Sequence, residues 1–531
     1  MKMLIVVPQG AMEPVGIAYI VSSLKKAGHD VECLNKSENY RLREVLTEER
    51  FDFIATGGLS SQYAGIKQII STAKKMGAKV ILGGGIVTCE PELIVRTLGV
   101  DFAVIGEGEE TVVELLSCIE SGGDVKSVAG IAFIEEGRFV LTDGRKPIAN
   151  LDSVPFPDWD VLELGKQLDC MRPSDSYFND IYDYPRVYPL ISSRSCPFLC
   201  TFCYHPLGQK YRKRSIDSIM DELEAAIPKY RINIVAIYDE LFASDEKRLQ
   251  EFCQRFRAFT SSLSWGVTWN CQMRVDKLTD NMLASMKGSG CFMVSYGFES
   301  YSQEVLKSMR KHITPDQIHK AIHMTLDRGI SIQANFIFGD VAETNATASE
   351  TLAFWKEHSF AGILLSFIFP CPDSYLYRYC IDKGIIKDRL HYIEKHFFDI
   401  YNMTQLSEEE FYRLRVAVVT AALKYYPRTV PLAVGDDSVK VRCPHCSQII
   451  EYRNFVITDN NAAIYAFRPN RLLFNKMMYC RNCRHRFFAV SRVYQIYSKV
   501  LVRLLSPGFL RRYEKAKHLM SHISFFDEGG D

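Results

Sequence analysis

Short apolar runs alternate with amphipathic segments throughout the first 143 residues. Runs of about five residues, such as MLIVV, FDFIATG and KVILGG, are separated by helix-like segments such as GIAYIVSSLKKAG and IKQIISTAKKMG. Parallel neighbouring strands need a helical crossover, so this alternation predicts a doubly wound, flavodoxin-like (Rossmann-like) α/β sheet. The hairpin pattern GIAFIEEGRFVLTD closes this predicted domain, which spans residues 1–143.

A second alternation of strands and helices follows a segment rich in Pro and Asp. Residues 144–185 lack periodicity and predict a linker with short helical pieces. About six strand–helix units then cover residues 186–400, which predicts a partial (β/α)6 TIM-type barrel. In such barrels the active-site residues lie at the carboxyl ends of the strands.

Composition excludes several classes of protein. Hydrophobic residues at 47% and charged residues at 24% are typical of a globular chain, and a net charge of +1 predicts no overall attraction to nucleic acid. No apolar run reaches the roughly 18 residues of a membrane span, and residues 1–7 are too short for a secretory signal. We therefore expect a cytoplasmic location, where the 16 cysteines are thiols or metal ligands.

Three cysteines follow the first predicted barrel strand, VYPLISS, in a CxxxCxxC pattern: Cys196, Cys200 and Cys203. Three thiolates on one short loop can hold three irons of a 4Fe–4S cluster and leave the fourth iron open to a substrate or cofactor. The alternatives are a structural zinc loop that also uses His205, or unrelated buried thiols.

This loop resembles the signature of the radical S-adenosylmethionine (SAM) superfamily. The order of motifs over residues 1–400 resembles its cobalamin-binding subfamily, the class B methyltransferase-like members. The resemblance implies that the open iron binds SAM, and that one electron cleaves SAM to methionine and a 5′-deoxyadenosyl radical. It also implies an electron donor such as flavodoxin or ferredoxin.

The same resemblance implies SAM contacts at the ends of the barrel strands. They are Tyr204 at the adenine, Asp239, Glu240, Arg274, Glu299, Ser300 and Gly339. The chain departs from the family pattern at Gly339-Asp340-Val341, where relatives commonly have a Gly-Pro-Gly-like turn. Each residue alone is equally compatible with a surface salt bridge or a polar group of the barrel core, so the inference depends on their order and spacing.

Glycine-rich turns follow the N-terminal strands, where parallel sheets bind ligands. Their exposed amides suit a bulky ligand with an amide-rich rim, and also nucleotides, flavin or simple tight corners. The string LGGGIVTCEPELI … DFAVIGEGEETVVELL resembles a cobalamin-binding domain, and implies contacts from Ser60, Gly83, Gly84, Gly85, Thr88, Gly106 and Glu107. The motif D-x-H-x-x-G is absent, so the resemblance implies a cobalt that is not held by His. The alternative is a cobalamin-like fold that binds nothing or only supports the barrel.

Four further cysteines lie beyond a helical connector at residues 401–439. Cys443, Cys446, Cys480 and Cys483 form two CxxC pairs 33 residues apart within residues 440–490. Four thiolates in a closed site predict a structural zinc ribbon or a rubredoxin-like iron, and an electron-relay iron is the alternative. Residues 491–531 form a basic helical tail, either packed on the protein or in peripheral contact with an anionic membrane.

The favoured function is that of a cobalamin-dependent radical SAM enzyme that methylates an unactivated carbon. The resemblance implies that one SAM methylates reduced cobalamin, and that a substrate radical formed with a second SAM takes the methyl group from methylcobalamin. The alternatives are a radical SAM cyclase, rearrangement or C–C coupling enzyme without methyl transfer, and a non-catalytic cobalamin or metal sensor. The substrate stays open between a small molecule, a lipid and a peptide, and no nucleic acid is expected.

Overall fold

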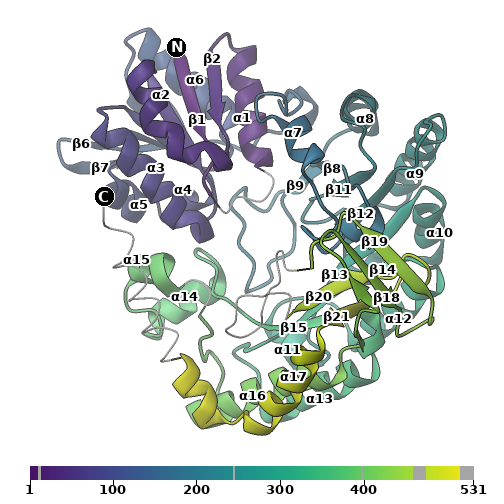
Figure 1. Cartoon of the computed structure of the whole chain (residues 1–531). Coiled ribbons are helices and arrows are strands. Elements are labelled where there is room, and N and C mark those ends of the chain that lie inside the picture. Colours follow the sequence, from purple (N-terminus) through teal and green to yellow (C-terminus); the bar gives the residue numbers. More distant parts are fainter. Residues whose placement is uncertain (10–13, 243–244, 397–398, 458–473, 515–531) are drawn as a thin grey trace.

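The chain forms a doubly wound sheet, an open barrel and a small two-sheet module (Figure 1). The structure is a computed structural model that describes residues 1–9, 14–242, 245–396, 399–457 and 474–514. The predicted basic tail at residues 491–531 therefore lies partly outside the described residues.

The N-terminal sheet is the predicted α/β sheet. Its seven strands run in the order β2-β1-β3-β4-β5-β6-β7, parallel through β5 and closed by the antiparallel β6–β7 hairpin. The strands are β1 (Lys2–Val6), β2 (Asp30–Leu34), β3 (Phe53–Gly57), β4 (Val80–Gly83), β5 (Phe102–Val104), β6 (Ile131–Glu135) and β7 (Arg138–Leu141). The helices are α1 (Val15–Lys26), α2 (Leu42–Glu48), α3 (Tyr63–Lys75), α4 (Gly85–Cys89), α5 (Pro91–Leu98) and α6 (Glu109–Glu120).

Helices cover both faces of this sheet because its strand residues alternate between two apolar cores. Met3 and Ile5 pack with α1 and α6, whereas Leu4 and Val6 pack with α3 and α5. The carboxyl ends of the strands are left for the connecting loops.

The barrel is a six-stranded parallel sheet in the order β8-β11-β12-β13-β14-β15, and β8 and β15 form its two edges. The strands are β8 (Val187–Leu190), β11 (Ile234–Ile237), β12 (Thr268–Met273), β13 (Cys291–Glu299), β14 (Ser331–Phe338) and β15 (Ile363–Phe367). The helices of its outer layer are α8 (Ile216–Tyr230), α9 (Glu246–Thr260), α10 (Asp280–Gly288), α11 (Gln303–Ser308), α12 (Pro315–Asp327), α13 (Asn345–Glu357) and α16 (Glu408–Tyr425). The predicted partial (β/α)6 barrel is confirmed.

The segment between the two sheets packs closely against the barrel. It contains α7 (Leu164–Asp169) and two 3-10 turns (Leu151–Ser153 and Asn179–Ile181). Trp159, Leu162 and Leu168 are buried in the same core as the barrel helices. The segment therefore contributes to the barrel core in addition to joining the domains.

A small module closes the amino-terminal end of the barrel. One of its sheets contains β16 (Arg428–Thr429), β20 (Asn475–Tyr479) and β21 (Arg486–Val490), and the other contains β17 (Ala433–Val434), β18 (Ser438–Arg442) and β19 (Ile449–Arg453). Tyr479 packs edge-on against Phe292, with ring centroids 5.9 Å apart, and shares a buried cluster with Val187 and Ile234. These three barrel residues lie at or near the starts of their strands, so the module covers that end of the barrel.

The remaining described α-helices are α14 (Tyr375–Asp382), α15 (Arg389–His391) and α17 (Arg492–Leu504), and a π-helical turn (Tyr392–His396) follows α15. Leu501 of α17 packs with residues of α16, whereas Ile496 and Leu504 are exposed. Within the described part of the chain, no helix has both the length and the apolar composition that a bilayer crossing requires.

Candidate active site

The CxxxCxxC loop lies at the carboxyl end of β8, as predicted. Strand β9 (Ser193–Arg194) leads into the loop and pairs with β10 (Arg212–Lys213), which follows it, so a two-stranded ladder closes the base of the loop. Cys200 is buried, Cys196 and Cys203 are half-buried, and all three are free thiols. The loop is therefore a fixed structure that presents three sulfur atoms.

Backbone hydrogen bonds join this loop to two distant segments. Thr201 N–H donates to the Met309 carbonyl oxygen at 3.1 Å, and Leu376 N–H donates to the Thr201 carbonyl oxygen at 3.0 Å. Ser195 and Arg310 adopt left-handed backbone conformations, with φ of 68° and 54°. Such conformations cost roughly 1–3 kcal/mol each in a non-glycine residue and persist where the surrounding packing imposes them.

A buried cation lies beside the thiols. Lys311 Nζ bonds to Glu299 at 2.7 Å, and its charge is close enough to Cys200 and Cys203 to favour their thiolates. A hydrogen bond with Cys203 lowers the pKa of Cys200 to about 7. Burial, together with the nearby Glu240 carboxylate, raises the pKa of Cys196. The loop thus combines soft sulfur donors with local positive charge.

Arg274 braces the loop. Its guanidinium lies 3.6 Å from the ring centroid of Phe198, between the first two cysteines, and donates to the Lys311 carbonyl oxygen at 2.8 Å. It also bonds to Asp276 at 2.9 Å. Arg274, predicted to contact SAM, therefore holds the cysteine loop and the Lys311 segment together.

The other predicted SAM contacts differ in their exposure. Glu240 is exposed at the end of β11, whereas Asp239 is buried and accepts hydrogen bonds from Ser192 and Ser193. Glu299 is buried against Lys311. Ser300 and Gly339 are also buried: the Ser300 hydroxyl bonds to Thr351 of α13, and Gly339 packs near Phe367 and Phe411. Among these five residues, Glu240 alone is open to solvent.

The glycine turns of the N-terminal sheet pack backbone against backbone. A Cβ on Gly84, whose φ is +88°, would lie 2.7 Å from Gly58 N, and a Cβ on Gly57 would lie 2.6 Å from the Gly83 carbonyl oxygen. Side chains are thus excluded where the β3 and β4 turns meet. Of the predicted cobalamin contacts nearby, Ser60 lies 3.4 Å from Cys89 Sγ, and Thr88 accepts a hydrogen bond from Gly106 N–H at 3.0 Å.

The cysteine loop and the glycine turns meet at Tyr204. Its hydroxyl donates to the Gly85 carbonyl oxygen at 2.8 Å. A Cβ on Gly85 would lie 3.2 Å from the Tyr204 ring, so this glycine permits the close approach. Cys371 and Asp373 lie near enough to act electrostatically on Tyr204, and burial raises its pKa. The residue after the third cysteine of the motif is thus in direct contact with the N-terminal sheet.

Glu107 joins the two domains. Its carboxylate accepts from Arg212 at 2.7 Å, from Arg194 at 2.8 Å and from the Ile148 backbone N–H at 2.7 Å. The side chains of Glu107 and Arg212 are 4% and 3% exposed, and Arg194 also bonds to Glu109 at 2.5 Å. Glu107, predicted to contact cobalamin, is fully engaged in this buried ion-pair network.

Comparison with protein families explains the pairing of these two domains. The family model "B12 binding domain" matches residues 1–116, and the model "Radical SAM superfamily" matches residues 190–354. The chain combines a B12-binding domain with a radical SAM domain. The first contains the glycine turns and Glu107, and the second contains the cysteine loop.

Curated relatives match about 70% of this chain at low identity. An uncharacterised methyltransferase of Pyrococcus horikoshii is 27% identical over 382 residues, which are 70% of this chain and 79% of the relative. An anaerobic magnesium-protoporphyrin IX monomethyl ester cyclase of Rubrivivax gelatinosus is 28% identical over 395 residues, which are 71% of this chain and 68% of the relative.

Solved structures share the fold. The radical SAM methyltransferase TsrM of Kitasatospora setae, with cobalamin and a 4Fe–4S cluster bound, has a TM-score of 0.60 at 16% identity and covers 72% of this chain and 75% of its own. The cobalamin-dependent radical SAM enzyme OxsB, with aqua-cobalamin and SAM bound, has a TM-score of 0.57 at 19% identity and covers 77% of this chain and 58% of its own.

The radical SAM domain implies a 4Fe–4S cluster and SAM, and the described donors fit them. Cys196, Cys200 and Cys203 supply three thiolates from one loop, and three cysteine ligands would leave the fourth iron of a cluster open. Glu240 is the exposed polar residue on the adjacent strand end. The B12-binding domain implies cobalamin, and the residues predicted to contact it lie at the turns after β3, β4 and β5, at the carboxyl ends of parallel strands.

The four C-terminal cysteines converge as predicted. Their sulfur atoms all lie within 4.8 Å of one another, and the Cys443–Cys483 and Cys446–Cys480 pairs are each 3.7 Å apart. Four sulfurs that bind zinc tetrahedrally at about 2.3 Å are roughly 3.8 Å apart, so this spacing fits a tetrahedral ion. Zinc in this site remains a proposal.

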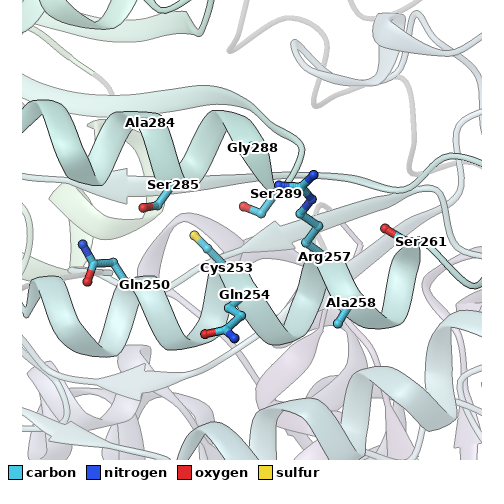
Figure 2. Close-up of a pocket in the computed structure, with 10 residues that line it drawn as sticks. All are labelled: Gln250, Cys253, Gln254, Arg257, Ala258, Ser261, Ala284, Ser285, Gly288 and Ser289. Atoms are coloured by element: carbon cyan, nitrogen blue, oxygen red, sulfur yellow. The ribbon is translucent and has the colours of Figure 1, made fainter.

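Figure 2 shows a pocket that belongs to the outer helices. It is lined by residues of α9 and α10 and their ends, including Cys253, Arg257 and Ser289. None of its lining residues lies on the cysteine loop or at a glycine turn. The pocket is therefore separate from the candidate active site.

Three basic residues beside the cysteine loop were not predicted from the sequence: Lys311, Arg194 and Arg212. Arg194 and Arg212 flank the cysteine loop as the paired strands β9 and β10, yet their partner Glu107 lies 87 and 105 residues away. Lys311 reaches Glu299 because the turn after α11 returns over the loop. The sequence signal that could have identified Arg194 and Arg212 is their position on either side of the cysteine motif.

Proposed function

We propose that the protein is a cobalamin-dependent radical SAM enzyme that transfers a methyl group to an unactivated carbon. The observation that carries the proposal is the Tyr204–Gly85 hydrogen bond. It places the cysteine loop of one domain directly against the glycine turns of the other, so two bound cofactors would face a common space.

The overall reaction is balanced as follows. Two SAM molecules, one substrate C–H group and two electrons give the methylated product, S-adenosylhomocysteine, methionine and 5′-deoxyadenosine. One SAM gives its methyl group, and the other gives the 5′-deoxyadenosyl group that takes the substrate hydrogen. The two electrons neutralise the two sulfonium charges, and we propose that a flavodoxin or ferredoxin supplies them.

The chemistry supplied by the bound cofactors is one-electron cleavage of SAM at the cluster and methyl carriage at cobalt. The chain's residues position these groups. The three cysteines hold the cluster, Lys311 balances its negative charge, and the Glu107 network fixes the distance between the domains. Such fixed placement restricts a reactive radical to a single nearby substrate.

The inner wall of the barrel is polar and favours a substrate with hydrogen-bonding groups. Ser295 and Gln333 are half-buried and bonded to each other across β13 and β14, and Asn335 is half-buried further along β14. Their neighbours Tyr296, Ala334 and Phe336 pack against the helices instead. The three polar side chains therefore lie on the face of the sheet opposite the helices.

A radical SAM reaction without methyl transfer is the second candidate, because a magnesium-protoporphyrin ester cyclase matches 71% of the chain. For location we propose a reducing cytoplasm, which suits sixteen free cysteines and an open-site cluster.

The experiment uses anaerobic holoenzyme, reductant, methyl-labelled SAM and a small-molecule extract of the source cells. Methyl transfer predicts label in an extract-derived product, with S-adenosylhomocysteine and 5′-deoxyadenosine formed together. Deoxyadenosine without S-adenosylhomocysteine would favour the second candidate. The variant with Cys196, Cys200 and Cys203 all changed to Ala is the control, and deoxyadenosine from that variant would contradict both.

A further inference from the structure

Three histidines lie together on the outer side of the barrel. His319 and His323 are on α12, and His358 directly follows α13. Their ligand nitrogens all lie within 4.8 Å of one another. His358 precedes β15 and so lies at the amino-terminal end of the strands, opposite the cysteine loop.

The local structure places His319 and His323 side by side and orients the ring of His358. Residues four apart on a helix lie on one face, so His319 and His323 project side by side from α12. His358 Nδ1 lies 2.9 Å from the Phe354 carbonyl oxygen. A carbonyl oxygen only accepts, so Nδ1 carries the proton and Nε2 keeps its lone pair. Metal-binding histidines commonly have this backbone partner on their other nitrogen.

The ring geometry also suits a metal ion. The centroids are 4.5 Å (His319–His323), 5.3 Å (His319–His358) and 5.7 Å (His323–His358) apart, with interplanar angles of 59°, 85° and 77°. The rings converge without stacking on one another. Three nitrogens bound to zinc at about 2.0–2.1 Å lie roughly 3.3 Å apart, so small side-chain rotations complete the site.

His358 has the most buried of the three imidazole rings, and Phe354 packs against it. Phe354 stacks on His358 with ring centroids 4.0 Å apart. His358 is buried, His323 half-buried and His319 exposed. A fourth coordination position would therefore face solvent and could take water.

We propose that His319, His323 and His358 bind a divalent transition-metal ion of the zinc type. Three imidazoles suit zinc, copper or nickel, whereas magnesium and calcium require oxygen ligands. The ion would join α12 to the end of α13 behind β13, β14 and β15. This site is distinct from the cysteine loop and from the four-cysteine module.

The test counts zinc in the holoenzyme. Wild-type protein and the double variant His319→Ala/His323→Ala are incubated with zinc, desalted and analysed. We expect one zinc fewer per chain in the variant, and an affinity for that ion reduced by at least about 100-fold, since even loss of an outer partner costs 10–100-fold. Zinc-edge X-ray absorption should show a nitrogen shell at about 2.0–2.1 Å in wild type, and this shell should be lost in the variant.

Two control variants separate loss of the three-histidine site from removal of an unrelated histidine and from loss of folding. His391→Ala removes an exposed histidine elsewhere and should leave both zinc content and spectrum unchanged. His319→Ala alone changes an exposed side chain, so its folding should be preserved while zinc binding weakens. Equal zinc in wild type and the double variant, or no nitrogen shell in wild type, would overturn the proposal.

Discussion

Arg194 donates a hydrogen bond of 2.8 Å to Glu107 across the boundary between the radical SAM and B12-binding domains. Arg194 lies two residues before Cys196, and Glu107 follows the last parallel strand of the N-terminal sheet. The two cofactor-binding regions are therefore fixed relative to each other by a buried ion pair that begins at the cysteine loop itself.

Glu107→Gln should destabilise the protein more than any exposed carboxylate change. The variant leaves Arg194 and Arg212 buried without their anion, and breaking a buried ion pair costs about 3–5 kcal/mol. Urea unfolding measures the difference. Glu110→Gln, at an exposed position beside Arg145, is the control and should change stability by less than about 1 kcal/mol. Equal effects in the two variants would contradict the role of Glu107.

The contribution of Glu107 to the free energy of unfolding should also depend on pH. Burial alone would raise its pKa, but hydrogen bonds from Arg212 and Arg194 lower it below the usual 4.5. A carboxylate with a lowered folded-state pKa stabilises the protein above its unfolded pKa and loses that contribution as pH falls through the folded value. The difference in the free energy of unfolding between wild type and Glu107→Gln should thus be constant above about pH 5 and become smaller below about pH 4.5. If this difference became larger as the pH fell, the lowered pKa of Glu107 in the folded protein would be wrong.

Tyr204→Phe should leave the cluster in place and weaken the contact between the domains. The change removes the hydrogen bond to Gly85, worth about 1 kcal/mol, and keeps the ring. We expect normal iron content, SAM cleavage within about twofold, and a fall of roughly fivefold in methylated product per deoxyadenosine. Chromatography of both products measures the ratio. An unchanged ratio would show that this hydrogen bond does not affect coupling.

Lys311→Met should make the cluster harder to reduce. It removes a buried cation beside Cys200 and Cys203, so the additional negative charge of the reduced cluster is less well balanced. Redox titration followed by electron paramagnetic resonance should give a more negative midpoint potential. Lys311→Arg, which keeps the charge, should lie nearer to wild type. A more positive potential in Lys311→Met would refute the electrostatic argument.

Cys446→Ser should release the C-terminal metal ion without removing cluster iron. Structural zinc sites supply about 10–16 kcal/mol of binding free energy to small modules, so this module should lose its fold. Limited proteolysis should cut the chain within residues 438–490, and iron analysis should be unchanged. The exposed Ser121→Ala is a neutral control. Loss of cluster iron in Cys446→Ser would contradict this prediction and would show that the cluster depends on the four-cysteine site.

Local patterns predicted the fold well. Strands and helices have different apolar periods, and their alternation is visible in runs such as FMVSYGFES followed by PDQIHKAIHMTLDRG. The cysteine loop was identifiable because its three ligands lie within eight residues, and the four-cysteine site because each half is a CxxC pair.

Contacts between distant segments could not be predicted in this way. Glu107 was assigned to cobalamin from its motif, but its partners were set by the packing of two domains. Ser300 and Asp239 follow strands as expected, yet whether each side chain points inward or toward a helix depends on strand twist and bulges, such as the register shift between Gly297 and Glu299. In the histidine cluster, His319 and His323 are visible in the sequence as a pair four residues apart, but their third partner, His358, follows another helix and joins them only through the packing of α12 and α13.

The packing of Tyr479 against Phe292 closes the barrel at the starts of its strands. Among the described residues, the four-cysteine module thus covers the strand starts, and the cysteine loop lies at the opposite end of the barrel, where Tyr204 contacts the N-terminal sheet. Unfolding of this module would expose Tyr479 and Phe292 to solvent at the end of the barrel that is remote from the cysteine loop.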